Sequence, residues 1–240
     1  MSEVPLALVT GGAHRLGRAF GLALARQGFA ILLHYHHSEE EAAAAADAIR
    51  ALGMPVYPVQ ADLTSSTNIE SLFSALDALP HSLKVLVNSA AVMPPGDVRT
   101  LSAGDFDVAI ALNLRAPFLC AQEAAKRMED GGLIVNVTDI GAQKAWGGFP
   151  AYTVSKAGLE SLTRVLARSL APRIRVNAIA PGLVLPSDYV TEEEWNRLVE
   201  RLPLKRPASV AEIASALEFL LENEYITGQT IVVDGGYSLL

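Results

Sequence analysis

The sequence predicts an α/β fold: a doubly wound, mainly parallel sheet of seven strands in a single domain. Short apolar runs rich in β-branched residues alternate with longer segments of helical period. The short runs are apolar at successive positions, as expected of parallel strands that helices cover on both faces. The 240 residues contain no low-complexity linker and no internal repeat, so the length fits one large domain.

Seven short runs have the composition and length of strands. Pro58 falls inside the third run, which predicts that this strand is irregular or close to its end, since proline cannot donate to a strand ladder. The predicted strands are Pro5–Thr10, Ala30–Tyr35, Val56–Gln60, Leu83–Asn88, Leu133–Val137, Ile174–Ile179 and Thr230–Val233.

Segments of helical period fill the gaps between these strands. The second helix opens with Glu39, Glu40 and Glu41, whose charge suits the positive end of a helix dipole, and alanines follow them. Each crossover between parallel strands is expected to be right-handed. The predicted helices are Leu16–Gln27, Glu39–Ala51, Asn68–Leu79, Phe106–Met128, Ala151–Leu170 and Val210–Leu221.

One segment breaks the alternation. Residues Gly182–Arg206 lie between the sixth strand and the last long helix, and the segment and its border carry Pro186, Pro203 and Pro207. Long connections in a compact domain are usually functional or disordered. We therefore expect a substrate lid at 182–206, within a single domain that spans 1–240.

Composition and charge exclude several kinds of protein. Only 19% of the residues are charged and the net charge is −7, which argues against nucleic acid or an anionic membrane as a partner. No apolar run reaches the roughly 18 residues of a membrane helix, and Met1–Pro5 does not resemble a signal peptide. The single cysteine, Cys120, excludes an internal disulfide and is expected to be buried. We expect a cytoplasmic protein.

No metal site is expected. The histidines have neither cysteine nor carboxylate partners at metal-ligand spacing. The five are His14, His34, His36, His37 and His81.

The first strand ends in a glycine-rich turn. The residues from Thr10 to Gly17 read T-G-x-x-x-R-x-G, and a helix follows at once. At such a turn the backbone N–H groups and the helix dipole favour a pyrophosphate, whereas an ordinary loop is the alternative. We expect Gly11, Arg15 and Leu16 to bind the phosphates of a dinucleotide.

The end of the second strand predicts which dinucleotide is bound. A site for NAD usually places an acidic residue here, about 20 residues after the turn. This sequence has His36, His37 and Ser38 instead, with no acid before Glu39. Imidazole and hydroxyl groups suit a 2′-phosphate, so NADPH/NADP is the expected cofactor; the alternative is that the histidines are merely solvated.

A tyrosine and a lysine share one face of a predicted helix. Tyr152 and Lys156 are four residues apart. A free tyrosine has a pKa of about 10, and a neighbouring ammonium is expected to lower that pKa. The pair then becomes a usable acid or base near neutral pH.

These motifs together resemble the short-chain dehydrogenase/reductase family, nearly end to end. The resemblance rests on the glycine turn, Ala61-Asp62-Leu63, Asn88-Ser89-Ala90, Asn113, the Tyr152-x-x-x-Lys156 pair, Pro181-Gly182 and Val233-Asp234-Gly235-Gly236. It implies a small-molecule substrate and a homotetramer built on the long helices.

The resemblance also implies roles for residues. Tyr152 would be the general acid, Lys156 would bind the nicotinamide ribose, and Asn113 would hold a water in the proton relay. Both Tyr152 and Lys156 would also contact the cofactor. The remaining cofactor contacts would come from Asp62 and Leu63 beside the adenine, from Asn88, Ser89 and Ala90 beside the nicotinamide ribose, and from Pro181 and Gly182.

Three departures from the usual family pattern narrow the resemblance. Asp139 stands where the family has a catalytic serine, thirteen residues before Tyr152. Arg15 replaces the second glycine of the turn, and His34-Tyr35-His36-x-Ser38 stands at the end of the second strand. This combination resembles the pteridine reductases and the related dihydromonapterin and dihydrofolate reductases. An ionised aspartate can only accept hydrogen bonds, so Asp139 favours reduction of a C=N bond over a C=O bond. Arg15 could also reach a pterin ring.

Alternatives remain at several positions. Thr138 could supply the missing hydroxyl, and Asp139 could be a polar loop residue. The pterin reading expects an aromatic residue after Ala90, where the sequence has Met93; Trp146, Tyr189 or Trp195, in loops near the site, could substitute. The whole chain could instead be a carbonyl reductase, such as a 3-oxoacyl thioester reductase, or a non-enzymatic scaffold that senses NADPH.

Overall fold

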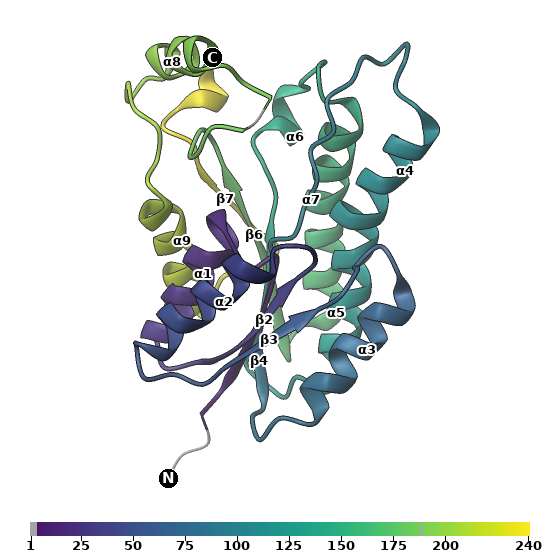
Figure 1. Cartoon of the computed structure of the whole chain (residues 1–240), viewed down its shortest axis with the longest axis vertical. Coiled ribbons are helices and arrows are strands. Elements are labelled where there is room, and N and C mark those ends of the chain that lie inside the picture. Colours follow the sequence, from purple (N-terminus) through teal and green to yellow (C-terminus); the bar gives the residue numbers. More distant parts are fainter. Residues whose placement is uncertain (1–3, 188) are drawn as a thin grey trace.

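The computed structural model describes residues 4–187 and 189–240, and within them it has one sheet of seven parallel strands (Figure 1). The strand order is β3-β2-β1-β4-β5-β6-β7. The predicted fold class is therefore confirmed. The strands are β1 (Leu6–Thr10), β2 (Ala30–Tyr35), β3 (Val56–Gln60), β4 (Leu83–Asn88), β5 (Gly132–Val137), β6 (Ile174–Pro181) and β7 (Thr230–Val233).

Helices cover both faces of this sheet (Figure 1). On one face lie α1 (Arg15–Arg26), α2 (Glu39–Arg50) and α9 (Val210–Glu222); on the other lie α3 (Ser66–Asp77), α5 (Ala116–Arg127) and α7 (Pro150–Leu170). Alternate residues of β1 enter the two cores: Ala7 and Val9 enter the first, and Leu6 and Leu8 the second. Shorter elements are α4 (Ala103–Ile110), the π-helical η1 (Ala111–Arg115), α6 (Gly141–Lys144), α8 (Glu192–Arg201) and the 3₁₀ turn η2 (Tyr237–Leu239).

The strand order reverses between β1 and β4. These strands are neighbours in the sheet although two others separate them in the chain, and Thr10 pairs with Asn88. The Thr10 hydroxyl accepts hydrogen bonds from the N–H groups of Ser89 (3.0 Å) and Ala90 (3.1 Å), which joins the two strand ends. Ligands of open α/β sheets bind beyond such a point of reversal, at the carboxyl ends of the strands.

Pro58 does not make its strand irregular, although it is only two residues from the strand's end, as one of the two predicted alternatives had it. Pro58 lies in the middle of β3 and pairs in register with Leu33 of β2. The strand order explains this, because β3 is at the edge of the sheet, and an edge strand tolerates a missing N–H on its open side.

The single helix predicted at Phe106–Met128 is interrupted in the structure. The helical segment begins earlier, at Ala103, where the Ser102 hydroxyl accepts a hydrogen bond from the Asp105 N–H (3.0 Å). Between α4 and α5 the backbone widens into the π-helical turn Ala111–Arg115. Pro117, two residues after this turn, has no N–H to bond the Asn113 carbonyl, so a regular ladder cannot pass this point.

The segment 182–206 contains a helix that was not predicted. Helix α8 starts after Thr191, whose hydroxyl accepts a hydrogen bond from the Glu194 N–H, while the Glu194 carboxylate accepts one from the Thr191 N–H. This reciprocal capping box fixes the helix start. The sequence Thr-Glu-Glu-Glu at 191–194 carries that signature.

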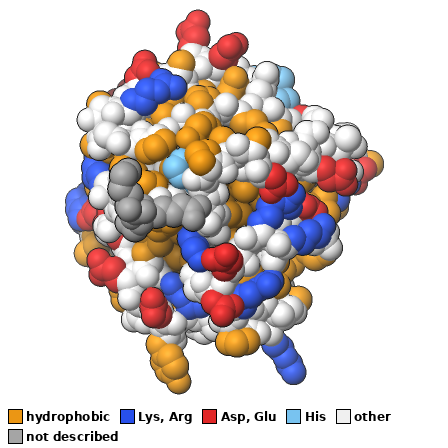
Figure 2. Space-filling view, turned by 90° about the horizontal axis from the view of Figure 1, so that it is seen from below, with side chains coloured by type: hydrophobic (Ala, Val, Ile, Leu, Met, Phe, Trp, Pro, Cys, Tyr) orange, Lys and Arg blue, Asp and Glu red, His pale blue; other side chains and the backbone are white. Residues whose placement is uncertain are grey.

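The charged residues at the surface and the buried residues are distributed as in an ordinary globular protein. On the face seen from below, Lys and Arg side chains stand beside Asp and Glu side chains (Figure 2). Cys120 is buried, as predicted, and burial raises the pKa of its thiol to about 12.

Among the described residues, no helix has the length and apolar character needed to cross a membrane. The same part of the chain brings together no cluster of three potential metal ligands.

Candidate active site

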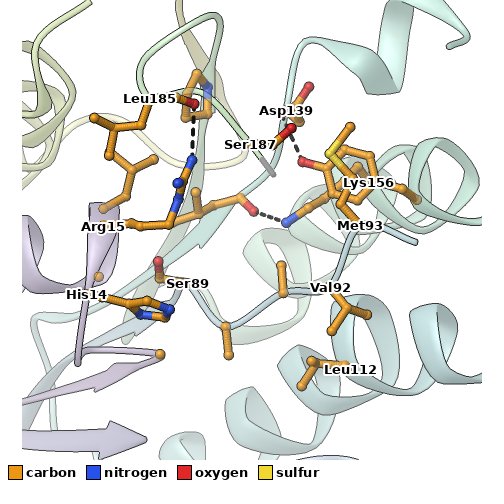
Figure 3. A pocket seen from close by; sticks show the side chains of 18 of the residues that line it. His14, Arg15, Ser89, Val92, Met93, Leu112, Asp139, Lys156, Leu185 and Ser187 are labelled. Carbon is orange, nitrogen blue, oxygen red and sulfur yellow. Dashed lines mark hydrogen bonds between the residues drawn. The ribbon is translucent and has the colours of Figure 1, made fainter. Parts of the chain in front are cut away.

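A cavity of about 1110 Å³ opens at the carboxyl ends of the central strands, and it continues under the segment 182–206. Figure 3 shows the cavity with Arg15 on one side and Asp139 and Lys156 on the other. Most of the residues predicted to form the site line it. They are Gly11, Arg15, Leu16, His36, His37, Ser38, Asp62, Leu63, Ser89, Ala90, Asp139, Tyr152, Lys156, Pro181 and Gly182.

The glycine turn leaves the start of helix α1 open toward this cavity. Gly11 has a φ of +64°, and a Cβ there would lie 2.9 Å from the Cα of Ala90. A Cβ at Gly17 would overlap the Gly11 carbonyl. The residue before the helix, His14, makes no side-chain cap hydrogen bond. The first N–H groups of α1 and its dipole are therefore available to an anion.

Arg15 connects this turn to the segment 182–206. Its φ is +50°, a conformation that favours glycine and costs another residue about 1 kcal/mol. This explains why the family pattern has glycine at this position. The guanidinium donates hydrogen bonds to the carbonyls of Pro186 (3.0 Å) and Leu185 (3.1 Å), as Figure 3 shows for Leu185.

The histidines after β2 lie at the far end of the cavity. His36 and His37 are exposed, and their ring centroids are 3.6 Å apart. Asp62 borders them from the end of β3; its carboxylate accepts hydrogen bonds from the hydroxyl (2.7 Å) and N–H (2.9 Å) of Thr64. These bonds lower the pKa of Asp62, and the two histidines lower that pKa further. This end of the cavity therefore combines imidazoles with one ionised carboxylate.

At the opposite end, Asp139 and Tyr152 are in direct contact. The Tyr152 hydroxyl donates a hydrogen bond to Oδ2 of Asp139 (2.8 Å), and the Gly141 N–H donates one to Oδ1 (2.6 Å). Lys156 donates to the carbonyl of Val137 (2.6 Å). Its Nζ lies 5.6 Å from the centroid of the Tyr152 ring. The Asp139 carboxylate, and no serine hydroxyl, is thus the partner of the tyrosine.

The expectation that Lys156 lowers the pKa of Tyr152 is wrong for this arrangement. Burial raises the pKa of Tyr152 well above its ordinary value, and the Asp139 charge raises it further. Burial also lowers the pKa of Lys156 to about 8, and it raises the pKa of Asp139. The tyrosine consequently keeps its proton and presents it to the carboxylate, as a proton donor must.

Asn113 is buried behind the pair and not among the residues that line the cavity. Its Oδ1 accepts a hydrogen bond from the Val92 N–H (2.9 Å), and its Nδ2 donates to the Val92 carbonyl (2.8 Å) and the Ser155 hydroxyl (3.0 Å). Ser155 in turn donates to the Tyr152 carbonyl (2.7 Å). Asn113 therefore ties the chain after β4 to the first turn of α7.

The side chains of Asn88 and Thr138 form hydrogen bonds with neighbouring strands of the sheet. The Asn88 amide donates to Oδ1 of Asn136 (2.9 Å) beneath the cavity floor and is not among the lining residues. Thr138 lines the cavity, but its hydroxyl donates to the Ile179 carbonyl (3.2 Å). That bond disfavours Thr138 as the substitute for a catalytic serine.

Several aromatic side chains line the cavity beyond Tyr152. Of those considered from the sequence, Trp146 and Trp195 line it together with Met93, whereas Tyr189 is not among the lining residues. Trp195 lies in helix α8, so its placement in a loop is wrong. Among the aromatic residues that line the cavity, sequence reasoning missed Phe149 and Tyr237. Their positions in the sequence could have indicated them: Phe149 directly precedes helix α7, and Tyr237 directly follows Gly235-Gly236.

Known proteins resemble this chain over nearly its whole length. A family model described as enoyl-(acyl carrier protein) reductase matches residues 11–238. The 3-oxoacyl-[acyl-carrier-protein] reductase FabG of Staphylococcus epidermidis is 32% identical over 237 residues, which are 96% of this chain and 97% of that protein.

Solved structures also resemble this chain over nearly its whole length. FolM alternative dihydrofolate reductase 1 from Brucella canis, complexed with NADP, is 37% identical with a TM-score of 0.93, over 100% of this chain and 96% of that one. A blue fluorescent protein from a metagenomic library, in complex with NADPH, is 30% identical with a TM-score of 0.91, over 98% of each chain. With the strand order and the Tyr152–Lys156 pair, these similarities show that the chain belongs to the short-chain dehydrogenase/reductase family of oxidoreductases.

Proposed function

We propose that this protein is an NADPH-dependent reductase that transfers hydride to a C=N bond of a pteridine-type substrate, a dihydropterin or dihydrofolate. The observation that carries the proposal is the 2.8 Å hydrogen bond from the Tyr152 hydroxyl to the Asp139 carboxylate. FolM, which resembles this chain, is named as an alternative dihydrofolate reductase and supports the same substrate class.

NADP(H) is the cofactor, and both FolM and the blue fluorescent protein were crystallised with it. The residues present suit it: a Cβ at Gly11 would collide with the backbone of Ala90, so only glycine lets the turn pass this close to the end of β4, beside the open start of α1. When bound, NADPH supplies the hydride. We assign the phosphates to Gly11, Arg15 and Leu16, the 2′-phosphate to His36, His37 and Ser38, and the adenine to Asp62 and Leu63. The nicotinamide end falls to Ser89, Ala90, Tyr152, Lys156, Pro181 and Gly182, above Asn88.

Tyr152 would deliver the proton that the reduced substrate needs. Its raised pKa keeps the hydroxyl protonated until a ring nitrogen accepts that proton. Asp139 orients the hydroxyl, and its second oxygen can accept an N–H of the substrate, which a ketone does not offer. Lys156 would stabilise the phenolate left behind, and Asn113 would organise the path by which the proton is replaced.

The rest of the cavity suits a flat ring. Met93, Trp146, Phe149, Trp195 and Tyr237 line the space beyond the catalytic pair. Aromatic and thioether side chains bind the faces of planar rings by dispersion and stacking. Met93 stands where pteridine reductases often have an aromatic clamp and is not aromatic, so we assign the stacking to this group as a whole.

We also propose that the segment 182–206 is the substrate lid, held down by Arg15. Replacing Arg15 with glycine is expected to raise the KM for the substrate roughly tenfold, because two hydrogen bonds to the lid are lost. The thermal midpoint should not fall, since glycine relieves the positive φ. Steady-state kinetics test this, with Arg18→Ala, an exposed arginine of the same helix, as the control. An unchanged KM would contradict the lid assignment.

Cofactor preference gives a separate prediction. NADPH should bind at least about tenfold more tightly than NADH, because the imidazole N–H groups of His36 and His37 can donate hydrogen bonds to the 2′-phosphate that NADH lacks. Changing His36 and His37 together to alanine should remove most of that difference. Calorimetric Kd values for both cofactors measure it, and NADH serves as the internal control since it lacks the 2′-phosphate. A wild-type Kd for NADH equal to or below that for NADPH would refute the assignment.

A carbonyl reductase is the second candidate. FabG of Staphylococcus epidermidis, named as a 3-oxoacyl-[acyl-carrier-protein] reductase, is 32% identical to this chain and supports it. A carbonyl reductase is expected to have a hydroxyl donor at position 139, and this candidate does not explain why the residue there is an aspartate. Turnover of NADPH with biopterin, dihydrobiopterin, dihydromonapterin and dihydrofolate distinguishes the two, and failure with all four would favour the second. The homotetramer and the cytoplasmic location stay predictions.

A further inference from the structure

His34 is a buried histidine that the reaction described above does not use. It lies near the end of β2, and only 2% of its surface is exposed. Its Nδ1 is 3.1 Å from the backbone nitrogen of Gly11, and its Nε2 is 3.0 Å from the carbonyl oxygen of Ala61. Its own carbonyl accepts a hydrogen bond from the Gly12 N–H (2.8 Å). One residue thus joins the glycine turn after β1 to the chain after β3.

Only one form of the ring satisfies both side-chain contacts. The Ala61 carbonyl can only accept, so Nε2 must carry a proton. The Gly11 N–H can only donate, so Nδ1 must offer a lone pair. The ring is therefore neutral, with its proton on Nε2. Burial agrees with this, since it lowers the pKa of His34 to about 4. The charges that face the ring act in opposite directions on that pKa: His36 lowers it and Asp62 raises it.

Both partners of the ring adjoin the proposed cofactor. Gly11, His34 and Ala61 all line the cavity. Gly11 belongs to the turn assigned to the phosphates, and Ala61 directly precedes Asp62 and Leu63, assigned to the adenine. The imidazole sets the separation of these two segments. Binding is tighter when such a site is held in its bound conformation beforehand, because less ordering is needed on binding.

We propose that His34 is a positioning residue for NADP(H), which fixes the glycine turn against the adenine segment through its two ring nitrogens. The inference rests on the proposed cofactor site. It concerns affinity for the dinucleotide and not the chemistry at Tyr152.

Two substitutions separate the two contacts. In His34→Asn the amide oxygen takes the place of Nδ1 and can still accept from Gly11, whereas the contact with Ala61 is lost. In His34→Gln the amide nitrogen takes the place of Nε2 and can still donate to Ala61, whereas the contact with Gly11 is lost. Because the turn holds the phosphates, His34→Gln is expected to raise the Kd for NADP⁺ about tenfold, and His34→Asn about threefold or less.

The control is a second histidine with both ring nitrogens engaged. His81 contacts the Tyr57 hydroxyl (3.1 Å) and the Val4 carbonyl (3.0 Å), and it is not among the residues lining the cavity. His81→Gln should lower the thermal midpoint and leave the Kd for NADP⁺ unchanged. In His34→Gln, kcat at saturating cofactor should stay close to that of wild type while the KM for NADPH rises.

A pH series on the wild type and on His34→Asn provides a second readout, one that a purely structural role of His34 would not produce. Because the pKa of His34 is lowered to about 4, the neutral ring persists above this value and is lost as the pH falls through it. The imidazolium cannot accept from Gly11, so wild-type affinity for NADP⁺ should fall relative to His34→Asn as the pH approaches about 4. Other effects of pH on the site and on the ligand are common to both proteins and cancel in the ratio.

The outcomes are distinct. A higher Kd in His34→Gln than in His34→Asn, with a ratio of wild type to His34→Asn that changes with pH, supports the inference. Equal Kd values in both variants and wild type, or a ratio that does not depend on pH, overturn it while the cofactor site stands. Failure of wild type itself to bind NADP⁺ overturns the proposed function and this inference together.

Discussion

Replacing Asp139 with serine is expected to lower kcat for dihydropterin reduction by roughly 100-fold, the usual contribution of a group that assists proton transfer. The variant loses the acceptor that holds the Tyr152 hydroxyl at 2.8 Å and the oxygen proposed to accept a substrate N–H. It gains a hydroxyl that can donate to a developing oxyanion. Reduction of a ketone should therefore be preserved or improved by the same change.

Asp139→Asn is the matched control for this experiment. It keeps the shape of the side chain and can still accept from the Gly141 N–H, but it removes the charge. Measuring kcat and KM of all three proteins with dihydrobiopterin and with an acetoacetyl thioester separates charge from geometry. If Asp139→Ser reduces dihydrobiopterin as fast as wild type does, the carboxylate has no part in the reaction.

Replacing Tyr152 with phenylalanine is expected to have the largest effect on the rate. The phenol is the proposed proton donor, and its loss should lower kcat by about 1000-fold or more. The Kd for NADPH should change by no more than about threefold, because a single hydroxyl is removed from a large contact surface. Stopped-flow measurement of hydride transfer, together with calorimetry, tests both statements.

Tyr57→Phe provides the comparison for Tyr152→Phe. Tyr57 is a tyrosine of the edge strand β3 whose hydroxyl contacts His81, away from the cavity. Its loss should affect stability and leave kcat unchanged. A Tyr152→Phe variant with more than about a tenth of wild-type kcat would show that another group donates the proton.

The sheet was predictable because its central strands are buried on both faces. Val85, Leu86 and Val87 of β4 are all buried, which produces an apolar run without alternation. The interruption at Ala111–Arg115 was not predictable from periodicity, since a π-helical turn changes the register of the ladder and not the residue types. Pro117 was the only local indication of a break, and the apolar pattern continues through it as it would in an unbroken helix.

The sequence indicated which residues form the site, but it did not indicate how their pKa values shift. Spacing paired Tyr152 with Lys156, and the family resemblance added Asp139; the structure brings all three to one end of the cavity. Burial and the Asp139 charge raise the pKa of Tyr152, and neither effect can be read from a spacing of four residues. His34 shows the same limit, because its two partners are backbone groups 23 and 27 residues away.

The central claim is that the Asp139–Tyr152 pair serves reduction of a C=N bond. The most direct measurement is NADPH consumption by the wild-type protein with dihydrobiopterin and, in parallel, with an acetoacetyl thioester near neutral pH. Turnover of the pterin with little or none of the thioester is the predicted result. Turnover of the thioester alone would contradict the claim and establish a carbonyl reductase that tolerates an aspartate at position 139.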